Sequence, residues 1–221
     1  MRASRIAAFA LWAALFAAGT GRAEDGWRPL VTQDGVSVVE RDSPGRALPE
    51  LEAKVEIDAG IFEVLAVIVD VPNQTKWMHD CVEARFVRRD PADVAVIYNR
   101  TAQPWPVSDR DVVLHTEVVL LEPGKRAAVR FANVEDAGAP PVDSVVRMPR
   151  LAGVWDLVAL SPTRTRVTYR LDVDPGGSLP TWATARFSRN TPLQSLIGLR
   201  NRVFATQDQY TEFVAQWSAR R

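Results

Sequence analysis

The feature that most constrains this chain is a series of seven stretches between residues 82 and 173 in which apolar and polar residues alternate. A period of two sends successive side chains to opposite faces, which predicts β-strands with one buried face. Short turn sequences such as Glu122-Pro123-Gly124 separate them, whereas a parallel crossover needs about a dozen residues or more. We therefore expect one antiparallel sheet that curls. The predicted strands are 82–88, 94–101, 111–121, 126–133, 143–149, 152–160 and 164–173.

Further elements are predicted before this series. Residues 36–40 and 51–57 also alternate and predict two more strands. Asp58 is a candidate N-cap for a helix whose apolar residues recur every three or four positions as far as Val69. That helix should end before Pro72, because the residue preceding a proline is disfavoured in helical geometry.

The end of the chain changes character after Asp174-Pro175-Gly176-Gly177. Residues 178–217 are predicted to form a long amphipathic helix, which Pro192 should kink or divide because it removes a helical hydrogen bond. A long helix laid along the concave side of a curved sheet would close a chamber. The expected class is α+β, with a curved antiparallel sheet wrapped around a long C-terminal helix.

The first 23 residues have the pattern of a secretory signal peptide. Arg2 and Arg5 precede an apolar run over residues 6–18, and small residues then lead to a cleavage site after Ala23. The run is short for a membrane span. We expect residues 1–23 to be removed and residues 24–221 to form one exported domain, periplasmic or secreted, and monomeric.

The composition argues against several functions. Loss of Arg2, Arg5 and Arg22 with the signal leaves 24 basic residues against 27 acidic ones, which does not favour a nucleic-acid partner. The single cysteine, Cys81, cannot form an internal disulfide, and its own role is open. Two histidines and one cysteine without paired spacing predict no metal site, and no cofactor motif is present.

Several segments, in this order, resemble the START family of lipid-transfer domains. They are Pro104 to Asp111 (PWPVSDRD), Gly153 to Trp155 (GVW), Thr165 to Tyr169 (TRVTY) and Asp174 to Trp182 (DPGGSLPTW). The resemblance covers roughly residues 30–210. It implies a helix-grip (START/Bet v 1-like) fold and an internal hydrophobic cavity for one sterol, phospholipid or other hydrophobic molecule. It also implies that the C-terminal helix acts as a lid and that the ligand is carried without chemistry.

Strand parity and aromatic content predict which residues line the cavity. In the strand after Asp111, Val112 and Leu114 belong to the more apolar face, and Arg110 shares their parity. A guanidinium there would pair with Asp109 or with a ligand head group, because the preceding strand 94–101 contains no acid. The full candidate set for ligand binding is Tyr98, Trp105, Arg110, Val112, Leu114, Trp155, Tyr169, Leu171 and Trp182.

Two alternatives to a lipid carrier remain at this point. An enzyme of the cyclase or hydrolase type would need an inward acid–base pair, for which Tyr98, Arg110, Asp111 and Tyr169 are the available residues. A non-catalytic interaction module would have a collapsed cavity. Contact with a membrane is a further expectation, through arginines on the last helix such as Arg186 and Arg189. The preferred hypothesis is a soluble exported carrier with no catalytic residue.

Overall fold

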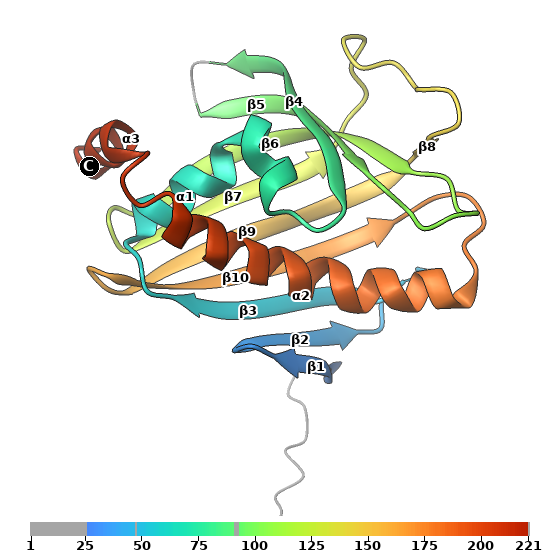
Figure 1. Ribbon diagram of the computed structural model, residues 1–221, viewed down its shortest axis with the longest axis horizontal. Coiled ribbons are helices and arrows are strands. Elements are labelled where there is room, and N and C mark those ends of the chain that lie inside the picture. The colour runs from blue at the N-terminus through green and yellow to red at the C-terminus, as the bar shows by residue number, and fades with distance from the viewer. Residues whose placement is uncertain (1–25, 47, 91–92, 221) are drawn as a thin grey trace, which may run out of the picture.

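The computed structural model describes residues 26–46, 48–90 and 93–220, so the predicted signal peptide lies outside the described residues. The chain forms an α+β fold in which helices cover one face of a ten-stranded sheet (Figure 1). Along the sheet the order is β1-β2-β3-β10-β9-β7-β6-β5-β4, and these neighbours are antiparallel. The strands are β1 (Trp27–Gln33), β2 (Val36–Arg41), β3 (Glu50–Ile57), β4 (Cys81–Asp90), β5 (Val94–Thr101), β6 (Arg110–Glu122), β7 (Arg126–Asn133), β8 (Val146–Arg147), β9 (Arg150–Ser161) and β10 (Arg164–Asp174).

The strand predictions are confirmed with two differences. β1 was missed, because this edge strand pairs only with β2 and its exposed and half-buried residues do not alternate. The strand predicted over residues 143–149 is wrong in extent, since only Val146–Arg147 pair, and they run parallel to β6. Ser144 has a positive φ of 65°, which breaks an extended conformation just before this short pairing.

The first helix, α1 (Ile61–Val69), begins after Gly60 and not at Asp58 as predicted. Glu63 explains the shift, because its carboxylate accepts a hydrogen bond from the Gly60 amide 2.5 Å away and satisfies the helix start. A short 3₁₀ helix, η2 (Val71–Lys76), then carries Pro72 in its first turn.

The C-terminal region forms two helices, α2 (Thr181–Ala205) and α3 (Thr211–Ser218). The predicted division of the helix at Pro192 is wrong, since α2 continues through this residue, which is buried, while the alternative of a kink stays a prediction. We attribute the tolerance to packing that offsets one lost hydrogen bond. The division falls at Thr206, whose hydroxyl donates to the Arg202 carbonyl at 2.8 Å.

The main core lies between the concave face of the sheet and α1 and α2 (Figure 1). Leu193, Leu196 and Leu199 on α2 are almost completely buried, as are Leu51 and Leu157 on the sheet. At Gly198, α2 approaches the backbone carbonyl of Trp77, so that an added Cβ would lie 2.0 Å from that oxygen. Only glycine permits this approach, which places α2 close against the segment after η2.

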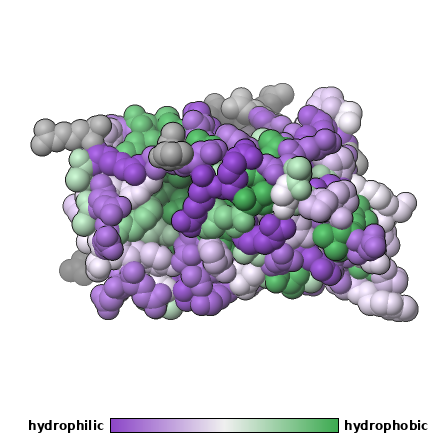
Figure 2. Space-filling model, turned by 90° about the horizontal axis from the view of Figure 1, so that it is seen from above, coloured by the Kyte–Doolittle hydropathy of each residue, from purple (hydrophilic) through white to green (hydrophobic). Residues whose placement is uncertain are grey.

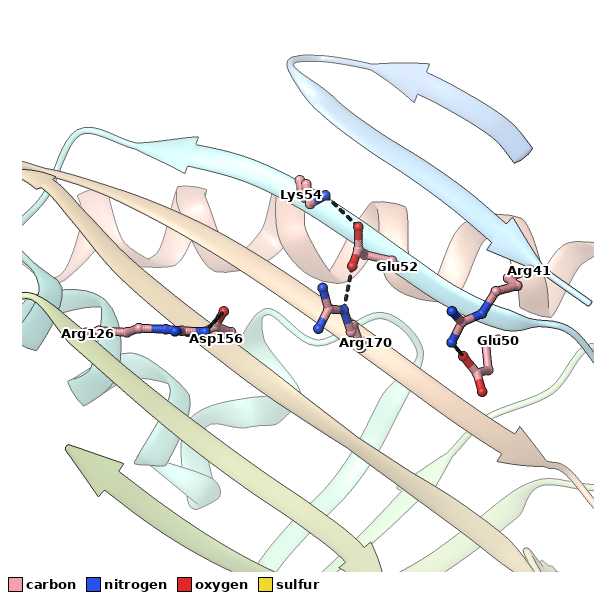
Figure 3. Close-up of polar contacts among 7 residues, drawn as sticks. All are labelled: Arg41, Glu50, Glu52, Lys54, Arg126, Asp156 and Arg170. Carbon is pink, nitrogen blue, oxygen red and sulfur yellow. Dashed lines mark hydrogen bonds and ion pairs between the residues drawn. The ribbon is translucent and has the colours of Figure 1, made fainter. Parts of the chain in front are cut away.

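The outer face of β3, β9 and β10 carries paired charges (Figure 3). Glu52 is almost buried beneath Lys54 and Arg170, and Asp156 receives two hydrogen bonds from Arg126 at 3.1 Å each. Charges therefore mark this face as the solvent side of the sheet.

The other end of the sheet differs, because the outer faces of β5 and β6 are covered and form a small second core of Val96, Tyr98, Val113 and Ala139.

The surface seen from above the view of Figure 1 mixes polar and hydrophobic residues, with small green areas between purple ones (Figure 2). None of the helices in the described residues has the length and apolar character needed to cross a membrane.

Candidate functional site

A cavity of about 500 Å³ lies between the concave face of the sheet and the helices. Its size falls within the range of about 300–1,000 Å³ that is usual for small-molecule sites. It receives side chains from α1, η2, β4, β5, β6, β7, β9, β10, α2 and α3. The interior is therefore not filled by the protein's own side chains, and the alternative of a collapsed cavity is wrong.

The wall of the cavity is mainly apolar and partly aromatic. Trp155 and Tyr169 stack with ring centroids 3.6 Å apart and planes 8° apart, and Trp77 meets Trp155 edge-on at 5.8 Å. The apolar lining residues include Ile68, Val69, Phe86, Ile97, Val112, Leu114, Val118, Val129, Phe131, Met148, Leu151, Leu171, Phe187, Phe213 and Trp217. Such a wall favours a ligand with a substantial hydrocarbon part.

A group of uncharged polar side chains interrupts the apolar wall. The Asn99 amide donates to Gln74 Oε1 at 2.9 Å, and the Gln74 amide donates to the carbonyl of Ile68 at 3.1 Å. Asn99 Nδ2 also lies 3.9 Å from the Cys81 sulfur. Burial raises the pKa of the Cys81 thiol, against the smaller effect of the Asn99 hydrogen bond, so this cysteine is neutral and adds to the polar group as a thiol.

Charged side chains gather where α3 meets the turn between β4 and β5. Asp70 accepts hydrogen bonds from the Tyr210 hydroxyl at 2.6 Å and from Asn73 at 2.7 Å. Arg220 forms an ion pair with Asp93 and lies over the Trp217 ring. Asp70, Asp93, Tyr210 and Trp217 are all lining residues, so α3 covers this end of the cavity, which we call the α3 end.

Five of the predicted ligand-binding residues lie in the cavity wall. They are Val112, Leu114, Trp155, Tyr169 and Leu171. Strand parity predicted Val112, Leu114, Tyr169 and Leu171, because side chains alternate between the two faces of β6 and β10. Trp155 was predicted only from its aromatic ring. Their contact with a ligand stays a prediction.

Tyr98 does not lie in the cavity wall, and its predicted place there is wrong. Its ring belongs to the small core on the outer face, where it packs with Val96 and Val113, and the Arg85 guanidinium lies 4.7 Å from the ring centroid. Burial and the adjacent Asp111 carboxylate raise the pKa of the Tyr98 hydroxyl to about 12. Both faces of β5 are apolar because both are covered, so parity alone could not distinguish them.

Trp105 and Trp182 also lie outside the cavity wall. Trp105 is 91% exposed at the tip of the loop between β5 and β6, flanked by Pro104 and by Pro106, whose peptide bond with Trp105 is cis. Trp182 is 48% exposed in the first turn of α2. The loop and the helix start in which these residues lie leave both rings exposed to solvent and not in the cavity.

Arg110 is buried, but it is not among the residues that line the cavity, contrary to the prediction. Its guanidinium donates to the carbonyls of Ser108 and Gly176, and burial lowers its pKa despite the nearby Asp109 charge. The predicted pairing with Asp109 is also wrong, because Asp109 pairs with Arg100 at 2.6 Å. Arg110 thus ties the start of β6 to the loop that precedes α2.

Asp111 completes the structural role of this segment. It is almost fully buried and is held by two hydrogen bonds from Arg147, at 2.7 and 3.1 Å. Arg147 also donates to the carbonyls of Ala139 and Pro140. The three charged residues 109–111 therefore join β5, β6, β8 and the loop before α2, and none of them lines the cavity.

The residues proposed for an enzymatic alternative are not brought together. Only Tyr169 of the four lines the cavity, while Tyr98 and Asp111 face the other side of the sheet and Arg110 binds backbone carbonyls. Among residues 26–46, 48–90 and 93–220, no group of three or more histidine, cysteine or acidic side chains is arranged to hold a metal ion.

Sequence reasoning missed Gln74, Asn99 and the α3 residues that close the cavity. Asn99 could have been found from its strand, because it shares the parity of Ile97, which also lines the cavity. Gln74 carried no signal, since nothing in the sequence shows that a 3₁₀ helix between α1 and β4 faces the interior.

A curved antiparallel sheet closed by helices over an apolar cavity defines the helix-grip class of ligand-binding proteins. The model of the START domain matches residues 12–203, and the chain belongs to this family.

Relatives and solved structures agree with this assignment. The uncharacterized protein PA1579 of Pseudomonas aeruginosa is 33% identical over 192 residues, which covers 86% of this chain and 93% of that protein. START domain-containing protein 10 of human and mouse is 27% identical over 76% of this chain and 57% of its own length. The STAR-related lipid transfer protein from Xanthomonas axonopodis (fragment 25–204) has a TM-score of 0.73 at 30% identity, covering 81% of this chain and 99% of that fragment.

Proposed function

We propose that this protein is an exported soluble carrier that binds one hydrophobic molecule in its internal cavity and moves it between membranes without changing it. The observation that supports the proposal most directly is the cavity of about 500 Å³ with its mainly apolar wall. Burial of hydrocarbon there contributes about 25 cal/mol per Å² removed from water. The lipid-transfer name of the Xanthomonas structure, at 30% identity, supports the same function.

The proposal includes transient contact with a membrane surface. Trp105 and Trp182 are both exposed, and tryptophan favours the boundary between lipid and water. Arg186 and Arg189 lie on the same part of α2 as Trp182 and would attract anionic head groups. The carrier works as a monomer, and its residues 1–23 direct it to the periplasm or outside the cell.

The test begins with the full-length protein recovered from its producing cells. Its position in the exported or the cytosolic fraction, and its mass with or without residues 1–23, test the export. Organic extracts of the purified protein are then analysed by mass spectrometry. We expect one class of lipid at about one molecule per chain, recovered unchanged after incubation, and failure of any lipid to co-purify or to bind on titration would contradict the carrier function.

A further inference from the structure

The shape of the cavity follows from the strands that line it. On β6 the lining residues run from Val112 to Val118, which span roughly 20 Å at about 3.3 Å per residue. Lining residues come from six neighbouring strands, β4, β5, β6, β7, β9 and β10, which would extend roughly 24 Å if they were flat. A volume of about 500 Å³ over that area would be only about 1 Å deep, so the strands wrap around the cavity and its long axis runs along them.

The width of the cavity suits one hydrocarbon chain. A volume of about 500 Å³ along roughly 20 Å leaves a mean cross-section of roughly 25 Å². A chain whose neighbours lie about 4 Å from its carbon atoms occupies on the order of 20 Å², so two chains side by side do not fit. An extended chain advances roughly 1.2 Å per bond, and the axis therefore holds on the order of 16 carbon atoms.

Helix α3 closes one end of this axis. Val118 lies at that end, because its amide donates to the carbonyl of Asp93 at 3.0 Å, and Asp93 pairs with Arg220 just after α3. Trp217 is only 5% exposed, stacks on Phe213 and also packs against α1. Both rings line the cavity, so together they form an end wall between the sheet and α1.

The charges at the α3 end do not require a charged ligand group. The acidic lining residues there each have a protein partner, which is Tyr210 for Asp70, Arg88 for Asp90 and Arg220 for Asp93. The aromatic end wall is instead suited to the methyl end of a chain, because burial of apolar surface against apolar surface is favourable.

The end wall also lies outside the part of the chain that matches the START domain. That match ends at residue 203, whereas α3 covers Thr211–Ser218. Membership of the family therefore does not determine how this end of the cavity is closed.

We propose that the cavity takes lipids with one linear hydrocarbon chain, and that Trp217 and Phe213 limit this chain to about 16 carbon atoms. The inference rests on the proposed carrier function and specifies the class of its ligand. It excludes lipids that must bury two acyl chains, such as diacylglycerols and diacyl phospholipids.

The test uses saturated monoacylglycerols, which share one uncharged head and differ only in chain length. The series from the decanoyl to the eicosanoyl ester competes with the neutral fluorophore N-phenyl-1-naphthylamine for the full-length protein, each ester below its aggregation concentration. We expect binding to tighten about tenfold for each two added methylene groups as far as the palmitoyl ester, and not beyond it. Dioctanoylglycerol carries as many acyl carbons in two chains and should bind at least about tenfold more weakly than the palmitoyl ester, because only one of its chains fits.

Substitutions at the α3 end assign the length limit to the end wall. Trp217→Ala removes a ring from the wall, so the limit should move about two to four carbons longer. Val118→Phe adds a ring at the same end without changing α3, and should move the limit to the myristoyl ester or shorter. The matched control is Phe131→Leu, because Phe131 lines the cavity opposite Thr116, beside the middle of the axis, and its loss should widen the cavity and leave the length limit in place.

The outcomes separate this inference from the carrier function. Affinity that rises past the palmitoyl ester without a limit, a limit that either Trp217→Ala or Val118→Phe leaves in place, or equally tight binding of dioctanoylglycerol would overturn the chain-length assignment and leave the carrier function standing. A limit that moves in Phe131→Leu would also overturn it. Failure of every ligand to displace the fluorophore would contradict both.

Discussion

At the scale of single residues, Glu52 is a carboxylate that lies almost buried on a face of the sheet that otherwise meets solvent. Its side chain is only 5% exposed, and it is covered by Lys54 and Arg170 on the outer face of the sheet (Figure 3). Burial acts to raise the pKa of Glu52, but the hydrogen bonds from Lys54 and Arg170 outweigh it and hold the pKa below its ordinary value. The ionised form therefore stabilises the fold.

We predict that Glu52→Gln lowers the free energy of unfolding by about 1–3 kcal/mol at pH 7. Because the pKa of Glu52 is lowered in the folded state, its carboxylate stabilises the fold at pH values above the pKa of the unfolded state. This stabilisation is lost as the pH falls through the pKa of the folded state. The difference in stability between wild type and variant should thus narrow in urea titrations as the pH falls below about 5. A difference that widened on acidification would contradict this.

The control for Glu52 lies on the same strand. Glu50 pairs with Arg41, but both side chains are about one-third exposed or more, so solvent screens the pair. Glu50→Gln should change stability by less than about 1 kcal/mol. Equal effects at Glu50 and Glu52 would show that burial of Glu52 is not the cause.

Side-chain placement was predictable only where one face of a strand is solvated. On β10 the alternation of Arg166, Tyr169 and Arg170 distinguished the two faces, and Tyr169 was placed correctly. On β5 the loop that carries Ala139 covers the outer face, so Tyr98 and Asn99 both became buried and the choice between them failed. The tertiary structure decides which distant segment of the chain covers a strand, and the local alternation of residues does not predict it.

At the scale of elements, α2 depends on one close approach to the rest of the fold. Gly198 meets the Trp77 carbonyl, and a Cβ there would lie 2.0 Å from the oxygen. In an exposed helix the change from glycine to alanine stabilises by roughly 0.5–1 kcal/mol. We predict the opposite sign for Gly198→Ala, a loss of about 1–3 kcal/mol, because α2 must move away from the η2 segment.

Chemical denaturation measures this effect directly. Asn201→Ala is the matched control, since Asn201 is exposed three residues further along the same helix and should show only the small gain from helix propensity. A stabilised Gly198→Ala protein would mean that α2 does not pack as described.

The extent of the elements was predictable to different degrees. Long alternating runs indicated the strands of the meander, because a period of two sustained over eight or more residues does not fit the 3.6-residue period of a helix. The break between α2 and α3 was not predicted, because a single threonine is a weak signal for a helix end, although the Thr206 hydroxyl donates to the Arg202 carbonyl there. The break matters for function, because it lets α3 cover the cavity separately from α2.

At the scale of the whole molecule, the α3 end is where we expect the cavity to exchange a ligand. Phe213 and Trp217 of α3 stack at 5.3 Å over this end, and two polar contacts hold the helix, Tyr210 with Asp70 and Arg220 with Asp93. Both contacts are partly exposed, so each contributes only modestly to the free energy that holds α3 in place. We therefore expect both contacts to open without unfolding of the sheet.

We predict that the double variant Tyr210→Phe with Asp93→Asn releases a bound fluorophore about three- to tenfold faster, with little change in stability. Stopped-flow transfer of N-phenyl-1-naphthylamine to an excess of vesicles gives the rate. Glu83→Gln is the control, because it breaks an exposed ion pair within β4 that does not touch α3. An unchanged rate in the double variant would place the exit elsewhere.

The opposite end of the molecule carries the exposed tryptophans, and its expected role is contact with the membrane. Trp105→Ala and Trp182→Ala should each weaken binding to anionic vesicles several-fold in a flotation assay, because each removes a large amphipathic ring that favours the interface. Leu160→Ala is the control, since Leu160 is 39% exposed at the far end of β9 from the Trp105 loop. An equal loss of vesicle binding in Leu160→Ala would indicate nonspecific adhesion. A loss of binding in the two tryptophan variants alone would indicate that the β5–β6 loop and the start of α2 face the lipid.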